Sequence, residues 1–145
     1  RRRKAVSMRL EGRVWKDEGS RYWLAEVPLL DVVTQGTSKT DALRMIADAV
    51  EALVDAPRFR ADVRRTGPLT FALGATPENT LVALMLRRLR EARRLTLMDV
   101  AKRLRSKSPN AYARYEQGKS VPSVEKLAEL IRAIDPAAEP ILKVG

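Results

Sequence analysis

Apolar and polar residues alternate with a period of two over the first third of the chain, which is the pattern of half-buried strands. The alternation predicts two strands, over residues 6–14 and 22–27, and residues 32–34 are predicted to form a short third strand. Pro28 ends the second strand and Gly36 closes the third. The residues expected on the buried faces of the first two strands are Val6, Met8, Leu10, Val14, Trp23, Ala25 and Val27.

The apolar period then changes to that of a helix. Ser38 is a good N-cap, and Asp41 three residues later completes a capping box. Apolar residues at helical spacing form one stripe: Leu43, Ile46, Ala47, Val50, Leu53 and Val54. Residues 57–66 can hold a short helix, and residues 69–73 predict a fourth strand. The predicted fold class is α+β, with a small antiparallel β-β-β-α-β domain that carries its helix on one face of the sheet.

An all-α second half is expected to follow. Gly74 and Ala75 are interpreted as a linker, which places the two domains at residues 5–75 and 76–145. Thr76 is expected to be the N-cap of the first helix of the second domain. The outward face of that helix is expected to carry Arg87, Arg88, Arg90 and Arg93.

Residues 96–123 predict two short helices joined by a tight polar connection. Thr96 is a good N-cap, with Asp99 placed to complete a weak capping box. Residues 105–108 break the pattern, and Pro109 is well placed as the first residue of the next helix. Such a pair of helices is typical of a helix-turn-helix, in which one helix braces across phosphates and the next enters the major groove.

Two further elements are expected near the C-terminus. Ser123 caps a last helix, and residues 141–144 can form an edge strand that is used in self-pairing.

Positive charge is concentrated in the second half of the chain. The net charge of the 145 residues is +10, and residues 76–145 carry 14 Lys and Arg against 8 Asp and Glu. The excess in the first half lies in the basic run at residues 1–4. A near-neutral half followed by a basic half is expected if the second half meets nucleic acid phosphates.

The composition argues against catalysis and against a membrane location. With no cysteine and no histidine, the chain lacks the commonest metal ligands and the commonest general base. No apolar run approaches the roughly 18 residues of a membrane span. The carboxylates that a metal-dependent nuclease would need are scattered: Asp17, Glu18, Asp31, Asp41 and Asp48. We expect no enzyme activity, no metal, no cofactor, and a soluble cytoplasmic protein.

Three segments resemble the Cro/repressor-type helix-turn-helix, namely residues 96–101, 114–118 and 121–123. Their spacing also fits that family. One departure is the connection at residues 105–108, which is a residue longer than usual and lacks the customary glycine.

Residues 22–28, 33–36 and 41–43 resemble the HicB antitoxin domain, a degenerate RNase H-like fold. The resemblance spans roughly residues 6–73. Residues 31–32 stand where family members often have a glycine. The resemblance implies an N-terminal domain that binds and blocks a HicA-type toxin, a small RNase, and a C-terminal domain that represses the pair's own operon.

The predicted recognition helix offers few base-reading side chains. Asn110 and Arg114 are expected to read base edges, because asparagine can bond adenine and arginine can bond guanine. A purely phosphate contact is the competing interpretation of Arg114. Tyr112 and Tyr115 are expected in the core, and Glu116 is expected to bond the turn at Gly118. The full set of expected DNA-binding residues is Thr96, Lys107, Ser108, Asn110, Ala111, Arg114, Lys119 and Ser120.

Two functions follow from these patterns. The first is a type II antitoxin that neutralises a HicA-type RNase and binds double-stranded operator DNA as a homodimer or larger oligomer. The alternative is a stand-alone transcriptional regulator whose sheet domain senses a ligand or only dimerises. A small basic protein encoded by the neighbouring gene would favour the antitoxin.

Overall fold

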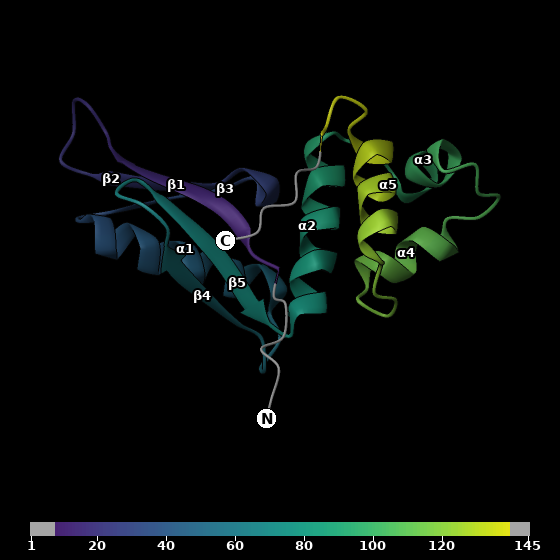
Figure 1. The fold of residues 1–145 in the computed structure, drawn as a ribbon, viewed down its shortest axis with the longest axis horizontal. Helices are drawn as coiled ribbons and strands as arrows, with labels where there is room; N and C mark the ends of the chain where they lie inside the picture. The colour runs from purple at the N-terminus through teal and green to yellow at the C-terminus, as the bar shows by residue number, and fades with distance from the viewer. Residues whose placement is uncertain (1–7, 140–145) are drawn as a thin grey trace. The chain divides into compact units, whose positions relative to one another are not determined.

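The structure, a computed structural model, describes residues 8–139. The chain divides into two compact units, residues 1–81 and 82–145, and the division falls within α2. Figure 1 shows the secondary structure elements. In chain order they are β1 (Leu10–Lys16), β2 (Trp23–Val27), the 3-10 helix η1 (Pro28–Leu30), β3 (Val32–Gly36), α1 (Lys39–Val54), β4 (Arg60–Arg65), β5 (Thr70–Thr76), α2 (Glu78–Ala92), α3 (Leu97–Arg103), α4 (Asn110–Glu116) and α5 (Val124–Ile134).

The N-terminal unit is one five-stranded sheet in the order β3-β2-β1-β5-β4, and every neighbouring pair is antiparallel. Helix α1 packs against the sheet and contributes Ile46 and Val50 to the core, both fully buried. The buried sheet residues that face it include Leu10, Val14, Ala25, Val27, Phe71 and Leu73. The predicted α+β class is therefore confirmed.

A glycine occupies one inward position of β1. Gly12 is paired with Phe71 of β5, and a Cβ at Gly12 would lie 2.2 Å from the Phe71 ring. The aromatic ring therefore fills the space that a side chain on Gly12 would need, as in the pairing of aromatic residues with strand glycines. This cross-strand pair explains the gap in the apolar alternation of β1.

The short helix expected over residues 57–66 is wrong, because this segment forms β4 at the sheet edge. Ala61 and Val63 lie on the helix side and are half-buried. Arg65, on the same side, donates to the Thr40 hydroxyl oxygen of α1 at 2.7 Å. Arginines dominate the rest of the strand, which gave it a polar appearance. Pairing with β5 stabilises β4, with Val63 opposite Leu73. An arginine-rich edge strand also discourages pairing with other chains.

The linker expected at Gly74 and Ala75 is also wrong, because both residues lie within β5. Gly74 is opposite Asp62 of β4, and the ladder continues to Thr76, which therefore ends a strand. A Cβ at Gly74 would lie 3.0 Å from the guanidinium carbon of Arg9, whose Nη2 reaches Asp62 Oδ2 at 2.7 Å. The glycine thus gives room for an arginine that crosses the strand.

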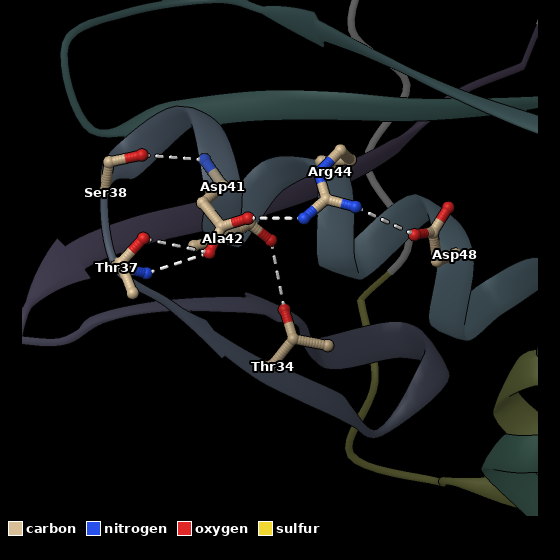
Figure 2. A network of polar contacts seen from close by, with 7 residues as sticks. All are labelled: Thr34, Thr37, Ser38, Asp41, Ala42, Arg44 and Asp48. Atoms are coloured by element: carbon tan, nitrogen blue, oxygen red, sulfur yellow. Dashed lines mark hydrogen bonds and ion pairs between the residues drawn. The ribbon is translucent and has the colours of Figure 1, made fainter.

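Figure 2 shows the start of α1, where the predicted N-cap is confirmed. The hydroxyl oxygen of Ser38 accepts a hydrogen bond from the Asp41 amide at 3.0 Å. The Asp41 carboxylate accepts from the Thr37 amide at 2.9 Å, one residue before the position that a capping box uses. That hydrogen bond and the one donated by Arg44, at 2.6 Å, lower the pKa of Asp41.

The end of β3 lies very close to the first turn of α1. A Cβ at Gly36 would be 2.4 Å from the backbone nitrogen of Ala42, so only glycine fits there without a shift of the backbone. Thr34 donates its hydroxyl hydrogen to the Ala42 carbonyl at 3.2 Å. These contacts fix the angle at which the chain leaves the sheet and enters the helix.

Helices α3, α4 and α5 belong to the C-terminal unit, together with the part of α2 that follows the division. The buried residues of α3, α4 and α5 are Val100, Ala101, Tyr112, Leu130 and Ile134. Ser123 caps α5 as predicted, accepting a hydrogen bond from the Lys126 amide at 3.1 Å.

Three sequence predictions fall wholly or partly outside the described residues. These are the basic run at residues 1–4, the first residues of the first strand and the edge strand at residues 141–144. Within residues 8–139, no helix combines the length and apolarity that crossing a bilayer requires.

Candidate nucleic-acid interface

The capping box at the start of α3 forms as predicted. The Thr96 hydroxyl oxygen accepts from the Asp99 amide at 3.0 Å, and the Thr96 amide donates to Asp99 Oδ2 at 2.8 Å. The hydrogen bond from the Thr96 backbone is the main cause of a lowered pKa at Asp99. The Thr96 amide already has an anionic partner. A phosphate at this end of α3 would therefore accept from the Thr96 hydroxyl or from the backbone amides of the residues that follow.

The break after α3 uses an arginine where a glycine is usual. Arg105 has φ of +59°, the left-handed conformation that favours glycine. The Ser106 amide donates to the Ala101 carbonyl at 2.8 Å, and the Arg105 amide donates to the Lys102 carbonyl at 3.0 Å. These two bonds form a Schellman motif, so the connection ends α3 in the ordinary way despite the missing glycine.

Two serines then direct the chain into α4. The Ser106 hydroxyl donates to the Ser108 carbonyl at 2.8 Å, and the Ser108 hydroxyl oxygen accepts from the Asn110 amide at 3.2 Å. Pro109 lies immediately before the helix rather than at its first position. Lys107 projects from this connection and is exposed.

Helix α4 is held by a two-pronged ion pair. Arg90 Nε donates to Glu116 Oε2 at 2.7 Å, and Arg90 Nη2 donates to Glu116 Oε1 at 3.0 Å. The side chains are 16% and 7% exposed, so solvent screens this pair only weakly. The hydrogen bond to Glu116 also raises the pKa of Arg90. Glu116 is structural, as expected, and it accepts both of these hydrogen bonds from Arg90.

The same arginine reaches a second element of the motif. Arg90 Nη1 donates to the Leu95 carbonyl at 2.9 Å, directly before the residue that caps α3. Arg90 therefore connects α2 to both helices of the motif, and its predicted place on an outward basic face is wrong. Because Arg90 and Glu116 are far apart in the sequence, only the folded chain reveals the pair.

The exposed side of α4 carries the residues expected to meet DNA. Asn110, Ala111 and Arg114 are exposed, whereas Tyr112 is 1% exposed and Tyr115 is half-buried. Burial is the main cause of the raised pKa of Tyr112, and the Glu116 carboxylate adds to it. The predicted division between an inward tyrosine side and an outward polar side is thus seen in the structure.

The C-terminal end of α4 brings three expected site residues together. The Lys119 and Ser120 amides both donate to the Arg114 carbonyl, at 3.0 Å and 3.3 Å. The Arg114 Nε donates to the Ser120 hydroxyl oxygen at 3.3 Å. This bond leaves the terminal nitrogens of the Arg114 guanidinium for another partner, while Lys119 is exposed.

Several other cations of the unit serve the fold. Arg93 donates to Asp135 and lowers its pKa. Arg103 Nη1 donates to the Ala133 and Ile134 carbonyls at 3.1 Å and 3.2 Å, which satisfies the end of α5. Sequence spacing did not identify these roles, because each depends on a residue at least 30 positions away.

The comparisons with known proteins agree with this geometry. A family model described as a helix-turn-helix domain matches residues 82–137, which include α3, α4 and α5. No curated protein and no solved structure matches the chain. The chain therefore has a C-terminal helix-turn-helix domain, a module of DNA-binding regulators.

Proposed function

We propose that the chain is a transcriptional regulator that reads double-stranded operator DNA with α4 in the major groove and α3 across the phosphates. The observation that carries this proposal is the exposed polar side of α4, held in place from behind by the Arg90–Glu116 pair. Asn110 and Arg114 read base edges. Lys107, Ser108, Lys119 and Ser120 contact the flanking phosphates.

Ala111 has a different role on this helix. It is exposed between the two base-reading positions and carries only a methyl group. A small side chain there lets the helix backbone approach the floor of the groove. The Ala111 methyl can also pack against the methyl group of a thymine.

The N-terminal unit gives this regulator its second partner. We assign it the role of an antitoxin domain that binds and blocks a HicA-type toxin. The segments that resemble HicB lie on β2, on β3 and at the start of α1. Their residues include Gly36 and Ala42, which make the tight strand-to-helix junction. The resemblance therefore supports a HicB-like fold for this domain. The HicA-type toxin is proposed as its partner because a domain of that fold would bind it.

DNA binding is tested with the full-length chain and a duplex taken from upstream of its own coding sequence. Fluorescence anisotropy should detect tighter binding to this duplex than to a scrambled duplex of the same length. Equal affinity for both duplexes would contradict a sequence-specific regulator.

Toxin binding is tested separately, by co-expression with the small basic protein encoded next to it. The full chain should rescue growth and should co-purify with that protein. Variants in α4 should keep both properties. If rescue fails while operator binding persists, the stand-alone regulator with a ligand-sensing or dimerising sheet domain becomes the better description.

A further inference from the structure

Two arginines of the C-terminal unit adopt a backbone conformation that suits glycine. Arg94 has φ of +56° and Arg105 has φ of +59°. The other non-glycine residues with positive φ in the described chain are Asp31 and Asp55, whose short polar side chains tolerate this region better. The fold thus places long cationic side chains at both left-handed non-glycine positions found in the described part of this unit.

The backbone around each arginine has the same design. The Leu95 amide donates to the Arg90 carbonyl at 3.2 Å, and the Arg94 amide donates to the Glu91 carbonyl at 3.0 Å. This is the Schellman pattern that also surrounds Arg105. Glycine would make the same backbone bonds without steric conflict. The two helices could therefore end in the same way with a glycine, and their termination does not explain an arginine at either position.

The two side chains also differ from the structural arginines around them. Arg90 and Arg93 have carboxylate partners, and Arg103 donates to backbone carbonyls. Within residues 8–139, the guanidinium groups of Arg94 and Arg105 are exposed and make no recorded ion pair or hydrogen bond. Their positive charge is available to a partner outside the chain.

Their positions bracket α3. Arg94 lies three residues before the helix begins, and Arg105 lies two residues after it ends. A helix of seven residues is about 10 Å long, so its two ends can meet different phosphates of the same strand. In a helix-turn-helix this first helix is the one that crosses the DNA backbone.

We propose that Arg94 and Arg105 are phosphate contacts at the two ends of α3, added to those on and beside α4. This inference rests on the proposed DNA-binding function. The two arginines anchor the bracing helix to the DNA backbone and contribute affinity for any sequence. An arginine in the left-handed conformation costs free energy, and the phosphate contact offsets that cost. Strained backbone is often found at functional sites for this reason.

The test uses glycine, because it should move stability and DNA binding in opposite directions. Arg94→Gly and Arg105→Gly should each raise the melting temperature by a few degrees, since they relieve the left-handed conformation. Each should weaken binding about five- to tenfold at 0.1 M salt, on operator and scrambled duplexes alike. Each should also reduce the slope of log K against log salt by about 0.9 for every chain bound to the duplex, the value for one phosphate contact.

Two matched variants make the result specific. Arg94→Lys keeps the charge and should keep the salt slope. Arg132→Ala removes an exposed cation of α5 that has no recorded partner in the described chain, and it should leave the slope unchanged.

Either of two results would overturn this inference alone. One is an unchanged slope in both glycine variants of a chain that binds DNA. The other is a fall in melting temperature, which would mean that the arginines stabilise the fold. A wild-type chain without salt-dependent DNA binding would overturn the proposed function and this inference together.

Discussion

Arg90 donates two parallel hydrogen bonds to the carboxylate of Glu116, 26 residues further along the chain. The pair joins α2 to the last turn of α4, and a third bond from Arg90 to the Leu95 carbonyl holds the start of α3. One guanidinium therefore sets the positions of both helices of the motif. Bidentate geometry and low exposure make this pair stronger than an ordinary surface ion pair.

Glu116→Ala should lower the free energy of unfolding of the C-terminal unit by about 2–4 kcal/mol, because it leaves a nearly buried guanidinium without its anion. Both tryptophans, Trp15 and Trp23, lie in the N-terminal unit. The urea midpoint measured by tryptophan fluorescence should therefore fall less than the midpoint measured by far-UV circular dichroism.

The double variant Arg90→Met/Glu116→Leu is the control for this prediction. Replacing both charges with apolar side chains should restore much of the lost stability, because no unpaired charge remains. A double variant that is as unstable as the sum of the single variants would contradict the assigned pairing.

Local signals predicted where three of the helices begin. The N-caps Ser38, Thr96 and Ser123 could be recognised because a cap bonds to an amide only three residues away. Tyr112 could be placed in the core because its helical spacing defined an inward side. Each of these predictions needs only residues within a few turns of one another.

The missed features all depend on contacts between different elements. The strand β4 is held by its register with β5, and Gly74 belongs to that ladder rather than to a linker. The helical spacing of Arg90 predicted a place on the basic outward face, whereas in the structure it pairs with Glu116. Alternation and capping describe one element at a time, so they do not reveal a contact that a residue makes with another element.

Gly36→Ala should destabilise the N-terminal unit by about 2–3 kcal/mol, because the new methyl group would lie 2.4 Å from the Ala42 backbone nitrogen. Tryptophan fluorescence should report a lower urea midpoint. Gly19→Ala is the matched control: Gly19 has open space around it and φ of +91°, so the cost should be only about 1 kcal/mol. Equal losses in the two variants would exclude a steric requirement at Gly36.

Arg114→Ala should cost about 1–3 kcal/mol of operator affinity and relax the preference at one base position, if Arg114 reads a base edge. The hydrogen bond from its Nε to Ser120 orients the side chain for such a contact. Competition binding with single-base operator variants measures this loss of preference. Equal losses on operator and scrambled DNA would instead place Arg114 among the phosphate contacts.

Lys119→Ala provides the comparison for Arg114. The lysine is exposed just after α4 and is expected to contact only phosphate. Its removal should weaken all sequences to a similar extent and reduce the salt slope by about one unit. A change in base preference would show that Lys119 reads sequence instead.

On the proposed antitoxin function, operator affinity should depend on the ratio of toxin to antitoxin. One helix-turn-helix binds weakly at physiological salt, and joining two of them raises avidity when their spacing matches that of the half-sites. Toxin bound to the N-terminal unit can change that spacing. Linkage then requires operator DNA to change toxin affinity by the same factor.

Titration of toxin into a fixed mixture of full-length chain and operator measures this coupling by anisotropy of the labelled DNA. We expect the bound fraction to change as toxin passes equivalence with the chain. An unrelated basic protein of similar size controls for simple competition for phosphates. A binding curve that stays flat through and beyond equivalence would mean that toxin binding and repression are independent, because no free energy would then be shared between the two sites.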